Sequence, residues 1–522
     1  MNDDDRLTQY LSDRAEAVAL APGDVRKITA RAARHRRSRQ AMSVAAAAIL
    51  LIGAVVLLSR SPSHQSVKVA GQAGVDRAPL TWSAVDVTDG LAWGRDAVDA
   101  GHGSLFSLST APGPVNPTDV ATKAVLYQSS DGRSWTTAGL PDDLSASALA
   151  ASSGSLYAVG TAPGGGGSID LVVASSNDGA HTWSEARLPQ PAADVKARFP
   201  NEVQILAPVI TSGPHGVVAA VTVVAMPDLA PLLPADAQTS GWQMNATGVD
   251  VFAPEPGCDP AKGIASSSSE SSPPSTASAS TIGACASKQP TVAKSYTWDE
   301  LGIDPALRQL VGGQVHLYTS SDGGSFEEIP NPGIDGGYTA DLIAGRDSYR
   351  LLVSGAFNGA IQPYSSPDGV TWTKSGSTFD GWIAASGTLA GNPVVVLDSV
   401  NGPEILSATP DGGWTAPAGL SAALRLPGAS GPGVQSAVIG PLGIAMVVLA
   451  GDTSYLVEST DGRQFTTRPV QDVAGPGSWI PDGITMNPDA VIVRLMPAMA
   501  PGSDPSATPV PGPQRLLVGT PG

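Results

Sequence analysis

Six aspartates of this chain stand in one repeated pattern and are the first candidates for chemistry. Each lies two residues after a Ser or Thr and directly before a Gly, and a Trp or Phe follows shortly afterwards. They are Asp131, Asp178, Asp322, Asp368, Asp411 and Asp461. A carboxylate can serve as a general acid, a general base or a nucleophile, so the set first suggests a hydrolase. A carboxylate beside Gly can instead accept N–H groups of its own turn, because Gly readily adopts a positive φ.

The residues around these aspartates favour the turn. Short β-rich runs such as Ala124–Tyr127 and Tyr455–Val457 precede them, and the aromatic residue after each turn begins a further strand and points inward. The aromatics are Trp135, Trp183, Phe326, Trp372, Trp414 and Phe465. We therefore predict six strand-to-strand turns with structural aspartates and packing aromatics, and we assign no catalytic residue.

Taken with its strands, the pattern resembles the Asp-box, or BNR repeat, of sialidase-like β-propellers. Its copies recur about every 45 residues, which suits a four-stranded blade. The resemblance implies an all-β propeller with seven blades, or six as the alternative, and turns that lie away from the central pocket. A run at Leu80–Val87 can pair with Gln514–Val518 and close the ring, which removes free sheet edges.

One interval, between the second and third motifs, is much longer, at about 145 residues where a blade takes about 45. It could hold two blades without a motif, or one blade split by an insertion. Strand-like runs at Asn201–Ala225 and Gln314–Ser320 favour the split blade. The insertion then covers about 226–313, and its Ser-rich tract from Ser266 predicts disorder.

Two cysteines, Cys258 and Cys285, flank that tract. Outside the cytoplasm such a pair is expected to form a disulfide, with two free buried thiols as the alternative. Their spacing does not fit a metal site and the histidines are dispersed, so we expect neither a metal nor a cofactor. Farther along, Thr297 and Glu300 have the spacing of a capping box, which predicts short helical turns from Trp298 to Leu310.

The N-terminal part predicts a membrane anchor. Residues 41–58 form an uncharged apolar run of nearly the length that crosses a bilayer, and only basic charges occur between Arg26 and Arg39. The positive-inside rule places residues 1–40 in the cytoplasm. Residues 59–77 then form a flexible linker, and residues 78–522 form the propeller outside the cytoplasm. A cleaved signal peptide is the alternative, but Ser59-Arg60-Ser61-Pro62 is a poor cleavage site.

An enzyme remains the competing interpretation. A sialidase-like site would imply an arginine cluster, a Tyr/Glu nucleophile pair and an acidic Asp on the central face, with an Arg-Ile-Pro type segment near the start of the domain. The propeller part offers only Arg95 before the first motif, and the nearest match, Arg198-Phe199-Pro200, comes after the second. We interpret that match as a loop that leads into a strand. The sequence therefore does not decide whether the protein is an enzyme, although it favours a protein that is not one.

The sequence thus predicts a single-pass, membrane-anchored bacterial propeller that binds an unknown protein or carbohydrate, with the lipid bilayer as partner of residues 41–58. The alternative is a sialidase-like glycoside hydrolase with a divergent site. A third hypothesis is signalling through the cytoplasmic segment 1–40. A formal net charge of −17 excludes nucleic acid as the main partner, because phosphate binding needs clustered Lys and Arg.

Overall fold

The computed structural model describes residues 79–498 and 514–522, apart from gaps at 88–94, 102–103, 111–123, 153, 166–167, 230, 234–241, 253–291, 331, 335, 357–358, 417–419, 421–423 and 425–431. Within these ranges no helix is long and apolar enough to span a membrane. The predicted cytoplasmic segment 1–40, membrane helix 41–58 and linker 59–77 lie outside them.

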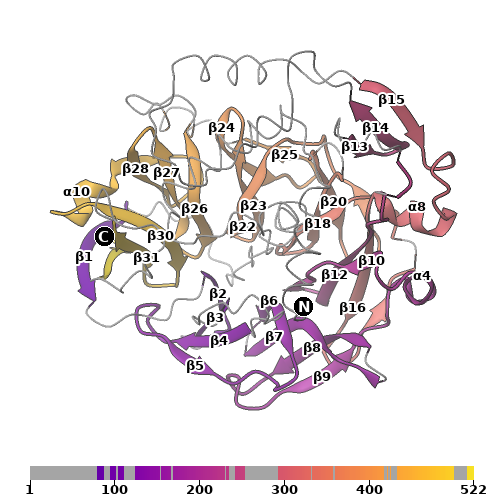
Figure 1. The fold of residues 1–522 in the computed structure, drawn as a ribbon. Coiled ribbons are helices and arrows are strands. Elements are labelled where there is room, and N and C mark those ends of the chain that lie inside the picture. The colour runs from indigo at the N-terminus through magenta and orange to yellow at the C-terminus, as the bar shows by residue number, and fades with distance from the viewer. Residues whose placement is uncertain are drawn as a thin grey trace, which may run out of the picture.

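Most described residues belong to antiparallel sheets, which we number in chain order (Figure 1). Sheet I contains β2 (Arg95–Asp99), β3 (Leu105–Thr110), β4 (Ala124–Ser129) and β5 (Thr136–Ala138). Sheet II contains β6 (Ser145–Ser152), β7 (Ser155–Pro163), β8 (Ile169–Ser176) and β9 (Ser184–Arg187). Sheet III contains β10 (Val203–Ile205), β11 (Val209–Gly213), β12 (Gly216–Ala225), β16 (Gln314–Ser320) and β17 (Glu327–Glu328).

The later sheets repeat the four-stranded order. Sheet IV contains β18 (Tyr338–Ala344), β19 (Tyr349–Ser354), β20 (Ile361–Ser366) and β21 (Thr373–Lys374). Sheet V contains β22 (Trp382–Leu389), β23 (Asn392–Ser399), β24 (Gly402–Ala408) and β25 (Trp414–Thr415). Sheet VI contains β26 (Gly433–Gly440), β27 (Gly443–Ala450), β28 (Thr453–Ser459) and β29 (Thr466–Pro469). Sheet VII contains β30 (Trp479–Met486), β31 (Val491–Pro497), β32 (Gln514–Thr520) and β1 (Thr81–Val87).

The sheets form a closed ring. The first strand of each sheet, or β11 in sheet III, contacts its counterpart in the next sheet, in the order β2, β6, β11, β18, β22, β26 and β30, and β30 contacts β2 again. These strands therefore lie innermost, and later strands lie progressively outward (Figure 1). A ring of antiparallel sheets around a centre is the arrangement of a β-propeller. The prediction of an all-β fold is confirmed.

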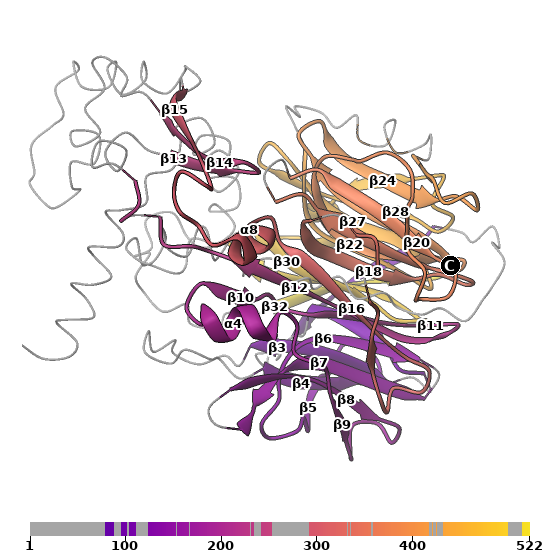
Figure 2. The same cartoon turned by 90° about the vertical axis from the view of Figure 1, so that its right-hand side faces the viewer.

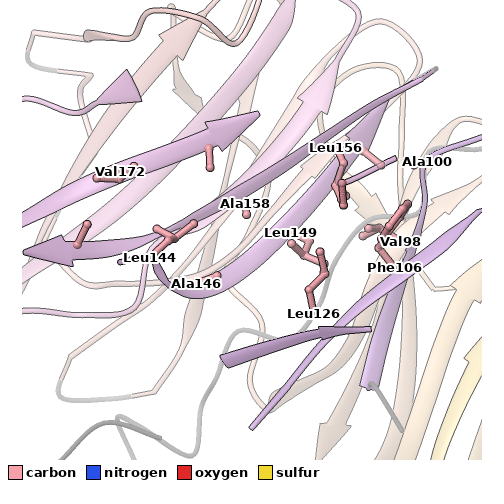
Figure 3. Packing of buried hydrophobic residues seen from close by; sticks show 14 residues of the cluster. Val98, Ala100, Phe106, Leu126, Leu144, Ala146, Leu149, Leu156, Ala158 and Val172 are labelled. Atoms are coloured by element: carbon pink, nitrogen blue, oxygen red, sulfur yellow. The ribbon is translucent and has the colours of Figure 1, made fainter. Parts of the chain in front are cut away.

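The hydrophobic core lies between neighbouring sheets. One cluster joins Val98 and Phe106 of sheet I to Leu149, Leu156 and Val172 of sheet II (Figure 3). Because both faces of a sheet are covered in this way, middle strands such as β12 and β27 are apolar and buried along almost their whole length instead of alternating. Similar clusters occupy the other junctions of the ring, so each sheet is held by the two beside it.

The two ends of the described chain close the ring. β1 pairs antiparallel with β32, from Thr81 opposite Thr520 to Val87 opposite Gln514, as the sequence indicates. Trp82 donates its indole N–H to Glu458 Oε2 of sheet VI at 2.6 Å, so β1 also holds the neighbouring sheet. Arg515 donates from Nε to Asp86 Oδ1 at 2.6 Å across the closing pair.

The insertion after β12 differs from our expectation of a disordered segment at 226–313. Its two ends are ordered as β13 (Trp242–Asn245), β14 (Gly248–Phe252), β15 (Val292–Thr297) and helix α8 (Pro305–Val311). The physical reason is a buried cluster in which Trp298, Leu307 and Leu310 pack with Val203 and Val223 of sheet III. The Ser-rich tract and both cysteines, Cys258 and Cys285, belong to 253–291, outside the described residues.

The capping box is present at the predicted position. The N–H of Thr297 donates to Glu300 Oε2 at 2.7 Å, and the N–H of Glu300 donates to Thr297 Oγ1 at 3.2 Å. The turn ends soon afterwards, and α8 begins separately with Asp304 as its N-cap and Pro305 in its first turn. Two further short helices, α4 (Ala193–Arg198) and α10 (Val470–Ala474), lie before β10 and after β29.

Candidate binding face

The six motif aspartates lie in turns that their own carboxylates organise. In the first turn, Asp131 Oδ1 accepts the N–H groups of Arg133 and Ser134, both at 2.8 Å, and Ser129 Oγ accepts the N–H of Gly132 at 2.8 Å. The turns of Asp368 and Asp461 repeat these bonds. The motif needs Gly directly after the Asp because the backbone there has a positive φ, +70° at Gly132.

The other three turns vary this scheme. Asp178 accepts the N–H groups of His181 and Thr182 because its turn is one residue longer. Asp322 Oδ1 accepts the N–H of Gly324 at 2.8 Å. Asp411 accepts the hydroxyl of Thr409, in a turn that reaches its aromatic residue one position earlier.

These hydrogen bonds set the charge of the aspartates. Burial alone would raise the pKa of Asp368, but the N–H groups of Thr371 and Val370 lower it overall to about 2. At Asp178 the Thr182 hydroxyl and N–H lower the pKa, and the remaining four aspartates shift in the same direction. A general acid needs a pKa near the working pH, so these ionised, engaged carboxylates suit a structural role.

Each motif turn also braces the ring. It joins the last two strands of its sheet, in sheets I to VI, and packs on the sheet before it. A Cβ added at Gly132 would press on Ile492 of sheet VII, and one added at Gly323 would fall on the ring of Tyr157 in sheet II. Sheet VII has no such turn, because its third and fourth strands, β32 and β1, come from distant parts of the chain.

The motif aromatics pack as expected. Trp135 and Trp372 are 8% and 6% exposed, and their indole N–H groups donate to the carbonyls of Gly132 and Gly369. Phe326 is buried as well. The remaining three, Trp183, Trp414 and Phe465, are half-buried. None of the six forms an exposed platform for a ligand.

The propeller has two distinct sides. We call the side with the motif turns the motif side; the turns between first and second strands share it, since Asn487 in the β30–β31 turn donates to the carbonyl of Asp131. The inner strands therefore begin on the opposite side, where the connection from β12 to β16 carries the insertion. We call this the insertion side. Figure 2 shows the insertion strands at the left and the C-terminus at the right.

The inner strands are irregular near their beginnings. Register shifts leave one residue unpaired in five of them: Ser147, Ala340, Ala384, Gln435 and Asp482. In β2 the shift falls between Arg95 and Val98, and in sheet III the inner strand is broken into β10 and β11. Bulges re-aim side chains and are common beside functional sites, so the insertion side is the candidate binding face.

Polar groups at these bulges are tied to neighbouring strands. Asp482 forms an ion pair with Arg494 of β31, and both side chains are mostly buried. Ser147 Oγ donates to the carbonyl of Pro208 in the next sheet at 3.2 Å. Gln435 Oε1 accepts the hydroxyl of Ser454 at 3.0 Å. The bulges thus hold a fixed set of polar positions around the centre of this face.

The residues considered for a sialidase-like site are not brought together. Arg198 ends α4, pairs with Asp304 at 2.6 Å and stacks its guanidinium 4.9 Å from the Phe199 ring centre. It therefore holds α4 against the start of α8 and has a structural role, although it ends a helix where the sequence predicted a loop. The Arg95 side chain lies outside the described part.

Other arginines are dispersed into separate ion pairs. These are Arg187 with Asp170, Arg308 with Asp299, Arg468 with Glu458, Arg494 with Asp482, and Arg515 with Asp86. Across the described ranges, no group of three or more His, Cys, Asp or Glu side chains could hold a metal ion.

Sequence reasoning missed Trp382, the first residue of β22. It is 41% exposed on the insertion side, next to Asp398, which pairs with it across β22 and β23. The available signal was the spacing: Trp382 follows Asp380-Gly381, which lies only 12 residues after Asp368-Gly369, whereas the motif copies recur about every 45 residues.

No family model matches this chain, and no curated protein matches it. Among solved structures it is similar to the GH74 xyloglucanase from Xanthomonas campestris, at 13% identity over 80% of this chain and 59% of that one, with a TM-score of 0.30. A phage phi92 endosialidase matches at 11% identity over 85% and 69%, with a TM-score of 0.35.

Trypanosoma rangeli sialidase matches at 10% identity over 74% of this chain and 56% of its own length, with a TM-score of 0.30. This chain therefore spans about three fifths of the xyloglucanase and slightly more than half of the sialidase. These proteins are distant from it, and the assignment of a propeller rests on its own ring of sheets.

Proposed function

We propose that this chain is a seven-bladed Asp-box propeller that acts as a binding module outside the cytoplasm, held at the membrane by residues 41–58. Sheets I to VII would be the blades, and the six motif turns would be the Asp boxes. The ligand is a protein or a glycan, and it binds on the insertion side.

One observation supports the proposal: the connection from β12 to β16 contains an ordered unit that is packed on the insertion side. The cluster of Trp298, Leu301, Leu307 and Leu310 against Val223 buries apolar surface, and the Arg198–Asp304 ion pair adds a second attachment. A fixed unit of this kind adds recognition surface beside the bulged inner strands without altering the ring. The motif carboxylates, by contrast, are engaged in their own turns.

Turnover assays separate this function from the hydrolase alternative. Full-length protein in lipid nanodiscs is incubated with sialyllactose and a panel of aryl glycosides, and product release is measured alongside binding. A binding module retains its ligand without releasing product. Hydrolysis that disappears in Asp482→Asn, at the bulge of β30, would establish the hydrolase instead; Asp489→Asn on the motif side is the matched control.

The membrane topology has its own test. Alkaline phosphatase is active only outside the cytoplasm, so a fusion after Gly522 should be active and a fusion after residue 40 inactive. The reverse pattern would contradict the proposed orientation. Release of the fused propeller into the medium would instead support the cleaved signal peptide.

A further inference from the structure

We propose that Arg350 binds a small oxyanion beneath the motif turn of sheet V, where that turn packs on sheet IV. The site lies on the motif side, so it is separate from the ligand proposed for the insertion side and does not depend on it. Three features support it: the place of a buried arginine in the repeat, the hydrogen bonds of its guanidinium, and the loose packing of one motif turn.

Arg350 occupies a position that neighbouring sheets fill with an apolar side chain. It lies directly opposite Ser365, the residue before the motif serine of sheet IV. The corresponding residues of sheets II and III are Tyr157 and Val218. Each of these two supports the motif turn of the next sheet, because a Cβ added at the glycine of that turn would press on it. By the same geometry, Arg350 lies below the motif turn of sheet V.

The face of sheet IV that carries Arg350 is turned towards sheet V. Leu352 lies two residues farther along β19 and therefore on the same face. It belongs to a buried cluster with Val395 and Leu397 of sheet V. The arginine thus replaces an apolar contact at the motif end of this junction.

The motif turn of sheet V packs more loosely than the others. A Cβ added at its glycine, Gly412, would have Ser365 Oγ and Ser375 Cβ as its nearest neighbours, both at 3.7 Å, and no atom of Arg350 within 4 Å. Gly412 is also half-buried, whereas four of the corresponding motif glycines are buried. Those four are Gly132, Gly323, Gly369 and Gly462. The space below this turn is therefore bordered by polar side chains where other junctions hold an apolar one.

The Arg350 guanidinium has only neutral partners among the described residues. The residue is 6% exposed, and Nη1 donates to Ser348 Oγ at 3.2 Å and to the carbonyl of Tyr349 at 3.1 Å. Nε is buried without a partner in the described part of the chain, and burial lowers the pKa of the group. Since both bonds leave from Nη1, the edge formed by Nε and Nη2 is the one that can bind a ligand. A buried charge without a counter-charge is costly, so an anion at this edge would stabilise it.

The geometry of that edge favours an oxyanion. Its two parallel N–H groups match two oxygens of a carboxylate, phosphate or sulfate, whereas chloride offers a single acceptor. Ser375 is 4% exposed, and its Oγ has no partner among the described residues. The same holds for the buried Nε1 of Trp414, which ends the motif turn of sheet V. All these groups can donate a hydrogen bond, as an anion requires.

Charged groups on the neighbouring elements lie at the surface. Asp411 of the motif turn is exposed and accepts a hydroxyl of its own turn, and Asp368 accepts N–H groups of the turn before. Asp347 and Arg346 are exposed in the turn between β18 and β19, and Lys374 is exposed on β21. Both signs of charge therefore surround the site, and solvent and salt screen them more than they screen the buried arginine.

The test measures anion binding by the full chain in nanodiscs of phosphatidylcholine. Calorimetric titrations use inorganic phosphate, sulfate and acetate at equal ionic strength, with chloride as the fourth probe. Phosphate and sulfate represent a free tetrahedral anion, and acetate represents a carboxylate group. We expect at least one oxyanion to bind at one site per chain, more tightly than chloride. That oxyanion should also raise the thermal unfolding midpoint, because a ligand of the folded state stabilises it.

Variants assign the binding to the arginine. Arg350→Met should weaken it at least tenfold and abolish the rise in the unfolding midpoint. Arg350→Lys keeps the charge but not the paired N–H groups, so it should weaken binding several-fold, as should Ser375→Ala. Arg308→Met is the matched control, because Arg308 is 26% exposed in an ion pair with Asp299 of the insertion. It should bind as the wild type does.

The proposed site is overturned if no oxyanion binds, if chloride binds as tightly, or if Arg350→Met retains the wild-type affinity. Should Arg350→Met not fold, the lysine variant decides, since an affinity equal to that of the wild type would exclude recognition by paired N–H groups. Equal losses in Arg308→Met and in the Arg350 variants would also overturn the site, because they indicate a general attraction of anions to positive charge.

Discussion

Replacing Trp82 with Phe tests how the ring is closed. Glu458 of β28 is 3% exposed, and its carboxylate accepts the Trp82 indole N–H at 2.6 Å, the Thr466 hydroxyl at 3.0 Å and Arg468 at 2.9 Å. Trp82→Phe removes the one donor that comes from the closing strand β1. A hydrogen bond to a buried charge contributes about 1.5 to 3 kcal/mol, so we expect the free energy of unfolding to fall by about 2 kcal/mol.

The measurement is urea unfolding of the full chain in detergent, followed by circular dichroism. Trp479→Phe is the matched control, because its indole N–H donates at an exposed site to Pro476, three residues away, and should contribute about 0.5 kcal/mol. A double-mutant cycle with Glu458→Gln should give a coupling energy of about 1 kcal/mol or more. Equal losses in the two Phe variants, or a coupling near zero, would refute the reasoning.

The remaining predictions concern the motif turns and the insertion. The folded-state pKa of Asp368 is depressed from 3.8 to about 2, so its contribution to stability is present above pH 3.8 and is lost as the pH falls through about 2. Asp368→Asn should therefore unfold at lower urea than the wild type at pH 7, with the difference vanishing near pH 2; a constant difference would contradict this. Gly323→Ala should destabilise by about 2 kcal/mol more than Gly179→Ala, because both have a positive φ but only the first Cβ meets a tyrosine ring; urea midpoints that coincide would exclude the clash. Arg198→Met should speed amide hydrogen exchange in α8 while costing under about 1 kcal/mol in global stability, since its ion pair with Asp304 is partly exposed; unchanged exchange would mean that the apolar cluster alone holds the helix.

Much of the ring could be predicted because the residues that specify each motif turn lie close together in the sequence. Each motif turn is built from hydrogen bonds within a few residues, such as Asp131 with Arg133 and Ser134, so residue types at fixed spacing suffice to identify it. The closing pair of β1 with β32 followed from counting strands, since a ring leaves no free edge.

The insertion could not be predicted in the same way. Strands β13 to β15 are short and lie beside a low-complexity tract in the sequence. They become ordered through a buried cluster that includes Val203 and Val223 of sheet III. Such burial is a tertiary effect that propensity does not contain. Trp382 was missed for a related reason: its exposure depends on which strand is innermost and on the glycines of two sheets.

The closing strand has a mechanical consequence. In the proposed membrane-anchored arrangement, the predicted linker 59–77 precedes Thr81, and tension between the membrane and a bound ligand would pass into β1. Force applied at one end of a strand loads its hydrogen bonds in turn, beginning with the Thr81–Thr520 pair, and peels the strand away. The bond from Trp82 to Glu458 and that from Arg515 to Asp86 lie directly in that path. They would set the pulling force at which the ring opens. The ring would open before tension reaches the inner strands.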